Sequence, residues 1–121
     1  MRIVRGDIIY IDLGQHAKSS VQSGMRPCVV VSNDKANRES KVINVCPLTS
    51  RQTKKNIPTH VAVAPEDVKG YLESTSTLLA EQITTVDKCR VISKVGHIEA
   101  ESELMDKISQ AVSRQLDGSL K

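Results

Sequence analysis

Arg26 is the residue of this sequence best placed to bind a phosphate group. It precedes Pro27, which favours an extended backbone in the residue before it, and it lies just before the β-branched run 29–31. A guanidinium held at the start of a strand is planar, always charged and able to donate two hydrogen bonds. Those properties suit the charge that develops on a phosphate during its transfer. The same arginine could instead form a salt bridge to a neighbouring strand.

Thr49 supplies a hydroxyl in a comparable position. It follows the strand-like segment 42–48 and precedes the basic stretch 51–55. At the edge of a sheet this hydroxyl could hydrogen-bond a phosphate, although a threonine that ends a strand is also an ordinary cap. If the fold brings Thr49 and Arg26 together, the pair would suit cleavage of a phosphodiester.

Most other catalytic signatures are absent from the sequence. It contains no phosphate-binding P-loop, no His-Glu-x-x-His pair, no dinucleotide-binding glycine turn, no Gly-x-Ser-x-Gly elbow and no acidic cluster of a two-metal nuclease. The histidines and cysteines lack the spacing of metal ligands: His16, His60, His97, Cys28, Cys46 and Cys89. We therefore expect no metal and no cofactor. We also expect a structural hydrogen-bonding role for His60 and buried free thiols at Cys28 and Cys46.

The composition fits a single globular domain spanning residues 1–121, with 39% hydrophobic and 26% charged residues. Tyr10 and Tyr71 are the only aromatic residues. This scarcity argues against cold-shock and RNA-recognition-motif proteins, which stack bases on aromatic side chains. The net charge of +3 is compatible with a polyanion or an acidic protein partner but establishes neither.

The sequence carries no sign of export or membrane insertion. The charges of Arg5, Asp7 and Asp12 interrupt the apolar N-terminal segment, and no apolar run approaches the roughly 20 residues of a membrane span. With its unpaired cysteines, the chain is expected in a reducing cytoplasm. Basic residues concentrate in three polar connections. The first contains Lys18 and Arg26, the second Lys35, Arg38 and Lys41, and the third Arg51, Lys54 and Lys55.

Short apolar segments separated by polar connections predict a mainly β fold, an antiparallel sheet curled into a partial barrel. In the first segment, Ile9, Ile11 and Leu13 alternate with polar residues, as in a half-buried strand. Gly6, in an Arg-Gly-Asp tripeptide, predicts a turn into that strand rather than an adhesion motif. The expected strands are residues 7–13, 28–32, 42–48, 60–63, 77–83 and 89–95.

Helices are expected mainly at the C-terminus. Apolar residues recur at three- and four-residue intervals near the C-terminus and predict one long helix that packs on the barrel. The residues of this apolar stripe are Leu104, Ile108, Ala111, Val112 and Leu116. Short helical turns are expected at 64–70 and 84–88. The polar segments 14–25, 33–41 and 50–58 are expected to be loops, where binding and catalytic residues concentrate.

An ordered series of motifs resembles the MazF/PemK ribonuclease toxins. The similarity covers residues 3 to about 112. Its motifs are Arg5-Gly6-Asp7-Ile8, Gly24-x-Arg26-Pro27, Val29-Val30-Val31-Ser32-Asn33-Asp34, Leu48-Thr49-Ser50, Pro58-Thr59-His60-Val61, Leu79-x-Glu81-Gln82-Ile83 and Asp87-Lys88.

This resemblance implies a small SH3-like partial barrel of the PemK/CcdB type, a two-fold homodimer and a metal-independent endoribonuclease that cuts single-stranded mRNA. Attack by the RNA's own 2′-hydroxyl would need no metal and would explain why RNA rather than DNA is cut. By resemblance, Arg26 and Thr49 are catalytic, and the substrate-binding residues are Ser19, Ser20, Gln22, Ser50 and Gln82. Similarity to Gram-positive members favours a pentanucleotide site around ACA.

The resemblance also implies an acidic, MazE-like antitoxin whose C-terminal segment occupies the RNA groove. Two alternatives remain open at this point. The related CcdB toxins use the same fold to block DNA gyrase by protein contact, which does not require Arg26 and Thr49. A non-catalytic RNA-binding module would retain RNA without cutting it.

Overall fold

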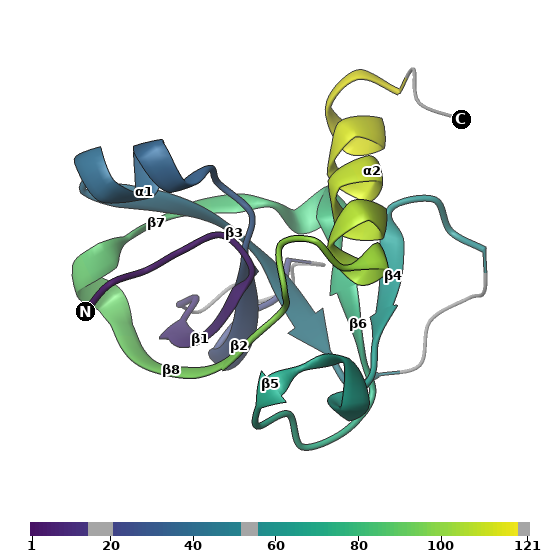
Figure 1. The fold of residues 1–121 in the computed structure, drawn as a ribbon, viewed down its shortest axis with the longest axis horizontal. Helices are drawn as coiled ribbons and strands as arrows, with labels where there is room; N and C mark the ends of the chain where they lie inside the picture. Colours follow the sequence, from purple (N-terminus) through teal and green to yellow (C-terminus); the bar gives the residue numbers. More distant parts are fainter. Residues whose placement is uncertain (15–20, 52–55, 119–121) are drawn as a thin grey trace.

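A computed structural model of the chain describes residues 1–14, 21–51 and 56–118. Figure 1 shows a strongly curled sheet with a long helix, α2, packed beside the strands β4 and β6. In chain order the elements are β1 (Asp7–Asp12), β2 (Met25–Val30), α1 (Asp34–Glu39), β3 (Val42–Thr49), β4 (His60–Val63), η1 (Pro65–Asp67), β5 (Lys69–Gly70), β6 (Ser76–Leu79), η2 (Ala80–Gln82), β7 (Thr84–Asp87), η3 (Lys88–Arg90), β8 (Val91–His97) and α2 (Glu103–Asp117).

The strands pair in the order β4-β6-β3-β2-β1-β8-β5, and β7 pairs separately with β3. All of these pairs are antiparallel. β3 bends the sheet because its first half pairs with β7 and its end pairs with β6. The predicted mainly β partial barrel with a C-terminal helix is confirmed.

The curled sheet encloses two apolar clusters, one on each face of β1. Ile8 belongs to the cluster that α2 covers, whereas Ile9 and Ile11 belong to the other. The prediction of a half-buried first strand was therefore wrong, since both of its faces carry buried isoleucines. Burial of each such side chain contributes about 1.5–3 kcal/mol, so β1 ties the two clusters together.

Helix α2 begins at a capped N-terminus, where the Ser102 hydroxyl accepts a hydrogen bond from the Met105 backbone N–H. The predicted long helix is confirmed, but its stripe is shifted. Met105 is buried alongside Ile108 and Ala111, while Leu116, predicted to pack on the barrel, is 69% exposed. Neither α1 nor α2, the two α-helices of the described chain, is long and apolar enough to cross a membrane.

Two segments have a different secondary structure from the one that the sequence predicts. Residues 84–88 were expected to form a helical turn, but Thr84–Asp87 is strand β7, in which Val86 pairs with Ile43 and is buried. Residues 33–41 were expected to be a loop but contain helix α1 (Asp34–Glu39), capped by the side chain of Asn33. In both cases a contact with distant or capping residues decides the conformation, which apolar periodicity does not reveal.

Several predicted boundaries also move. The strand expected at 28–32 begins at Met25, and the strand expected at 89–95 begins after the η3 turn. The segment expected as a strand at 77–83 ends early, because residues 80–82 form the η2 turn. The segment 64–70 contains the expected helical turn η1, but it ends in the short strand β5.

Polar contacts close the end of the sheet where β1 begins, which we call the closed end (residues 4–7, 31, 97 and 109). The Arg5 guanidinium donates to the Val31 carbonyl and to the Ser109 hydroxyl on α2. The buried Asp7 carboxylate lies 2.8 Å from His97 Nδ1 and 3.0 Å from Lys94 Nζ. These contacts join strands to the C-terminal helix.

Gly6 makes the turn into β1, as the sequence predicts. Its φ of +95° is a conformation that side-chain-bearing residues rarely adopt, and a Cβ here would clash with the Ile98 carbonyl. The Gly6 N–H donates to Val30, and its carbonyl accepts from Ile98. The Arg-Gly-Asp tripeptide is therefore structural.

Candidate functional site

Arg26 and Thr49 lie at the opposite end of the same strands, which we call the open end (residues 12–14, 21–26 and 48–50). Strands β2 and β3 pair with Cys28 opposite Pro47 and Val29 opposite Cys46. Continued toward the open end, this antiparallel register sets Arg26 opposite Thr49. The Arg26 guanidinium reaches the carbonyl of Leu48, the residue before Thr49, so the two residues proposed from the sequence lie at the same end of neighbouring strands.

The Arg26 guanidinium is held by backbone carbonyls on both sides. Its Nε donates to the Ser23 carbonyl at 3.1 Å, and a terminal nitrogen lies 3.5 Å from the Leu48 carbonyl, at the outer limit of a hydrogen bond. Among the described residues, no hydrogen bond occupies the other terminal nitrogen. The group is thus oriented but keeps donors that could bind an anion.

Thr49 is almost completely buried, with 6% of its surface exposed. Its hydroxyl oxygen accepts a hydrogen bond of 3.2 Å from the Arg51 N–H. Because the oxygen acts as an acceptor here, the hydroxyl proton can be donated to another group. Ser50, the next residue, is exposed at the edge of the sheet.

A hollow of about 300 Å³ borders this end of the sheet. Arg26 and Ser50 line it, and so do both tyrosines of the chain, Tyr10 and Tyr71. The sequence did not predict that Tyr71 lies near Arg26, because Tyr71 reaches this hollow only through the pairing of β5 with β8. The other lining residues are Met25, Pro27, Leu48, Leu72, Glu73, Ser74, Ser76 and Val95.

A second hollow, of about 260 Å³, contains Gln22 and Gln82. The Gln22 N–H donates to the Gln82 side-chain oxygen at 2.6 Å, so two predicted substrate-binding residues meet across 60 positions of sequence. Pro47 lines this hollow and Leu48 lines the first. Since neighbouring residues of a strand face opposite sides, the hollows flank β3. The predicted contacts Ser19 and Ser20 lie outside the described residues.

Glu81, beside Gln82, is bound to the start of β4. Its carboxylate accepts a hydrogen bond of 2.9 Å from the Thr59 hydroxyl and lies 2.8 Å from His60 Nε2. Partial burial opposes ionisation, but hydrogen bonds from His60, its own backbone and Thr59 outweigh it and lower the pKa of Glu81. The structural hydrogen-bonding role predicted for His60 is confirmed.

Cys28 and Cys46 are buried free thiols, as predicted, whereas Cys89 is exposed. Burial raises the pKa of the Cys28 thiol to about 12, and burial likewise raises that of Cys46 to about 12. Both thiols are therefore protonated at neutral pH and are poor nucleophiles. Within residues 1–14, 21–51 and 56–118, no group of three or more His, Cys, Asp or Glu side chains could hold a metal ion.

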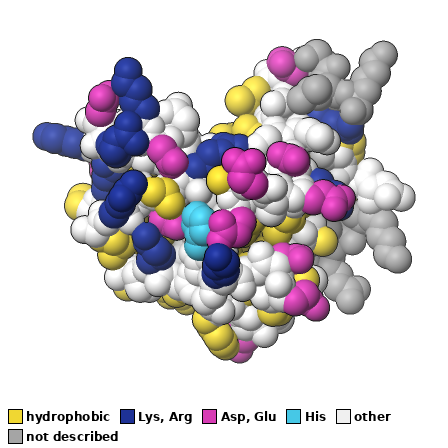
Figure 2. Space-filling view, in the orientation of Figure 1, with side chains coloured by type: hydrophobic (Ala, Val, Ile, Leu, Met, Phe, Trp, Pro, Cys, Tyr) yellow, Lys and Arg dark blue, Asp and Glu magenta, His cyan; other side chains and the backbone are white. Residues whose placement is uncertain are grey.

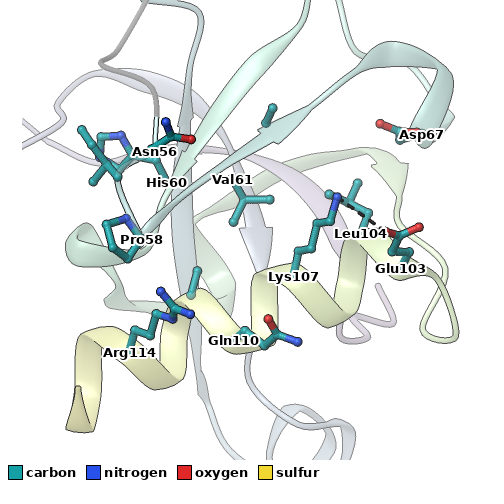
Figure 3. Close-up of a pocket in the computed structure, with 13 residues that line it drawn as sticks. Asn56, Pro58, His60, Val61, Asp67, Glu103, Leu104, Lys107, Gln110 and Arg114 are labelled. Carbon is teal, nitrogen blue, oxygen red and sulfur yellow. Dashed lines mark ion pairs between the residues drawn. The ribbon is translucent and has the colours of Figure 1, made fainter. Parts of the chain in front are cut away.

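A third hollow, of about 580 Å³, lies between β4 and α2 and contains neither Arg26 nor Thr49. Figure 3 shows Asn56, Pro58 and His60 at the end of this groove near Arg114, with Glu103 near its other end. Its walls combine apolar side chains with the charged residues Asp67, Glu103, Lys107 and Arg114. We call it the α2 groove.

The basic residues do not all gather at the open end. In Figure 2, lysine and arginine side chains concentrate on the side of the molecule where Figure 1 places α1. Lys35 and Arg38 belong to α1, and Asp34 at its start accepts from the Arg5 N–H at the closed end. The second predicted basic cluster is therefore remote from Arg26.

Residues 4–116 match the family model of PemK-like, MazF-like toxins of type II toxin-antitoxin systems. The chain is 38% identical over 117 residues to the endoribonuclease EndoA of Bacillus subtilis, covering 96% of each protein. It is 38% identical over 116 residues to the endoribonuclease MazF of Staphylococcus saprophyticus, covering 96% of this chain and 89% of the relative.

Among solved structures, the fold is similar to an endoribonuclease from a mycobacterial species in complex with its cognate antitoxin. The two chains share 30% sequence identity with a TM-score of 0.73, and the similarity covers 94% of each.

Proposed function

This chain belongs to the family of PemK-like, MazF-like toxins of type II toxin-antitoxin systems, and from that premise we propose that it is a sequence-specific endoribonuclease that cleaves single-stranded mRNA. The observation that carries the proposal is the Arg26 guanidinium at the open end, 3.5 Å from the carbonyl of Leu48, the residue before Thr49. The names of its relatives, both endoribonucleases, support the same activity.

In the proposed reaction, the 2′-hydroxyl of the RNA loses its proton and its oxygen forms a bond to the adjacent phosphorus. The bond from phosphorus to the 5′-oxygen breaks, and the 5′-oxygen takes up a proton. The products are a 2′,3′-cyclic phosphate and a 5′-hydroxyl. Arg26 donates to the non-bridging oxygens as negative charge builds on them, and the Thr49 hydroxyl donates to the same phosphate. Arg26 acts electrostatically, because a guanidinium keeps its proton at neutral pH.

Substrate contacts are proposed on both sides of this pair. Ser50 lies beside Arg26 at the first hollow, and Gln22 and Gln82 lie at the second. Ser19 and Ser20 complete the set by resemblance. We propose a pentanucleotide around ACA as the recognition site and the cytoplasm as the site of action.

One experiment separates this function from its alternatives. The purified chain is incubated with a long mixed RNA in the presence of a chelator, and separately with gyrase and DNA. We expect discrete RNA fragments whose ends share a sequence, and no effect on gyrase. Gyrase inhibition without RNA fragments would favour a CcdB-like poison, and retarded but intact RNA would favour a binding module. Either of these results would contradict the proposal.

We also propose that the chain, as a single domain of residues 1–121, forms a homodimer through the α2 groove. β4 is an edge strand of the sheet. Glu103 and Arg114 both line the groove and lie about three helical turns apart on one face of α2. Two antiparallel copies of α2 would place each Glu103 opposite the Arg114 of the other copy, so the surface is complementary to itself.

The homodimer is tested by charge reversal. Arg114→Glu should shift sedimentation toward the monomer, and adding Glu103→Arg should restore the dimer. A wild-type chain that sediments as a monomer at every concentration would contradict this assembly.

The proposed protein partner is an acidic, MazE-like antitoxin whose C-terminal segment covers the open end. The mycobacterial endoribonuclease of similar fold was solved with its cognate antitoxin, which supports such a partner. Removal of the antitoxin's C-terminal segment should abolish inhibition. Full inhibition by the truncated antitoxin would exclude blocking of the open end by that segment.

A further inference from the structure

The η2 turn is bound on two sides by side chains of its own residues. On one side Glu81 accepts from the Thr59 hydroxyl at 2.9 Å and lies 2.8 Å from His60 Nε2. On the other side the Gln82 side chain accepts from the Gln22 N–H at 2.6 Å. This turn of three residues therefore connects β4 to the segment that leads into β2.

The connection continues from Gln22 to Arg26. Ser23 follows Gln22 in the chain, and its carbonyl accepts the 3.1 Å hydrogen bond from Arg26 Nε. The Ser23 carbonyl lies in the Ser23–Gly24 peptide plane, and one rigid plane, that of Gln22 and Ser23, separates it from the plane that carries the Gln22 N–H. The position of Gln22 therefore limits the direction of that carbonyl. A displacement of Gln82 would therefore change the direction of the Arg26 guanidinium.

The other end of the connection is rigid. The Ala80 N–H donates to the Thr59 carbonyl at 2.9 Å, and Ala80 is completely buried. His60 Nδ1 is buried and has no hydrogen-bond partner among the described residues. A proton on that nitrogen would be unsatisfied, so the favoured tautomer carries its proton on Nε2, which donates to Glu81.

We propose that Glu81 and His60 are positioning residues for Arg26, acting through Gln82, Gln22 and the Ser23 carbonyl. The proposal rests on the proposed function only in that Arg26 is taken as catalytic. Their bonds fix η2 against β4, and η2 in turn fixes the segment before β2. A guanidinium directed at a transition state must be held closely, since a shift of about 1 Å can cost up to about a hundredfold in rate.

The central test variant is Glu81→Gln. A glutamine has one acceptor oxygen and a neutral NH2 donor in place of two acceptor oxygens, so it cannot accept from both Thr59 and His60 and it loses the negative charge. The matched control is Glu99→Gln, which makes the same chemical change in an exposed ion pair with Lys69. We expect kcat for RNA cleavage to fall about tenfold in Glu81→Gln, with KM nearly unchanged and Glu99→Gln like wild type.

A double-mutant cycle distinguishes positioning from general support of the fold. In a Gln82→Ala background the connection is already cut, so adding Glu81→Gln should lower kcat by less than about twofold. A tenfold loss in both backgrounds would overturn the proposal, and so would a Glu81→Gln variant with the kcat of the control. His60→Gln, whose amide can still donate to Glu81, should keep more activity than His60→Ala. Equal losses of activity in the two variants would also contradict the positioning proposal.

A spectroscopic readout keeps this test independent of the enzymatic activity. The NMR signal of the Arg26 Nε–H reports its hydrogen bond to Ser23, and it should shift in Glu81→Gln and not in Glu99→Gln. If wild type fails to cut RNA, the proposed function fails while this measurement still decides the coupling. An unchanged Arg26 signal in folded Glu81→Gln and folded His60→Ala would refute the coupling even in an active enzyme.

Discussion

One arginine lies at each end of the ladder that β1 and β2 form, Arg5 in the turn before β1 and Arg26 in β2, and the two arginines are bound very differently. At the closed end both terminal nitrogens of Arg5 donate within the fold, to Val31 and to Ser109 of α2. At the open end one terminal nitrogen of Arg26 makes only a 3.5 Å contact with the Leu48 carbonyl. The same side chain thus serves as a structural link in one place and keeps donors available in the other.

The neighbouring polar groups follow the same division. Asp7 is buried, and its carboxylate binds His97, Lys94 and the Val4 N–H. Thr49 is equally buried, but its hydroxyl oxygen is engaged only as an acceptor within the described part of the chain. Satisfied polar groups stabilise a fold, whereas donors left unsatisfied beside a hollow can bind a substrate. The difference supports the proposed division, in which the closed end stabilises the fold and the open end cleaves RNA.

The largest effect is expected at Arg26. Arg26→Ala removes the donors directed at the phosphate, so kcat for RNA cleavage should fall by about a hundredfold to a thousandfold, equivalent to about 2.7–4 kcal/mol. The melting temperature should change little, because the side chain makes few contacts in the fold. Timed cleavage of a labelled RNA beside a thermal melt measures both quantities. A folded Arg26→Ala variant with wild-type kcat would remove the proposed site.

Arg5→Ala should have the opposite effect, a loss of stability with little change in kcat. It leaves the Val31 carbonyl and the Ser109 hydroxyl without their charged donor, and it should lower the free energy of unfolding by about 2–3 kcal/mol. The kcat of the folded fraction should remain near wild type, since the open end is untouched. Urea titration followed by circular dichroism measures the stability. Loss of activity without loss of stability at Arg5 would invert the proposed division.

The sequence predicted part of each end. The turn at Gly6 and the presence of a strand after it are local patterns, so they could be read along the chain, whereas the contacts of Arg5 and Asp7 with distant residues could not. Arg26 and Thr49 were identified as individual residues, but their pairing depends on the register of β2 and β3, which bulk apolar patterns do not fix. The contact between Gln22 and Gln82 joins residues 60 positions apart and had no local signal.

The wrong assignments have the same origin. Val86 takes its strand conformation from pairing with Ile43, although the preceding threonines resemble a helix cap. Helix α1 has only six residues and no apolar stripe, so its one sequence signal was the capping residue Asn33. The Glu81 contacts with β4 could not be foreseen, because η2 interrupts a segment that reads as continuous strand.

A pair of glycines extends the comparison of the two ends. Gly6 at the closed end and Gly24 at the open end both have positive φ, at +95° and +76°. Alanine at Gly24 should cost about 1 kcal/mol for the backbone conformation alone, since its Cβ would meet no atom of the described residues within 4 Å. Alanine at Gly6 adds a clash with the Ile98 carbonyl and should cost about 1 kcal/mol more. Equal unfolding free energies for the two variants would show that the closed end is not tightly packed.

The smallest expected effect concerns the pH dependence of stability near the open end. Because hydrogen bonds lower the pKa of Glu81 in the folded protein, the carboxylate contributes stability above the usual glutamate pKa of about 4.3. That contribution disappears as the pH falls through the lowered folded value. Wild type should therefore lose stability more steeply than Glu81→Gln below about pH 4.3, as measured by urea unfolding at a series of pH values.

Salt separates this contribution from that of Glu99, whose pKa is lowered by its exposed contact with Lys69. At 1 M salt the screening length is about 3 Å. The free energy of unfolding of Glu99→Gln at acid pH should therefore approach that of wild type. Hydrogen bonds from His60 and Thr59 are short-ranged and are screened much less, so the difference between Glu81→Gln and wild type should persist. If salt removed both differences equally, the Glu81 contact would be an ordinary surface ion pair, too weak to fix η2 beside Arg26.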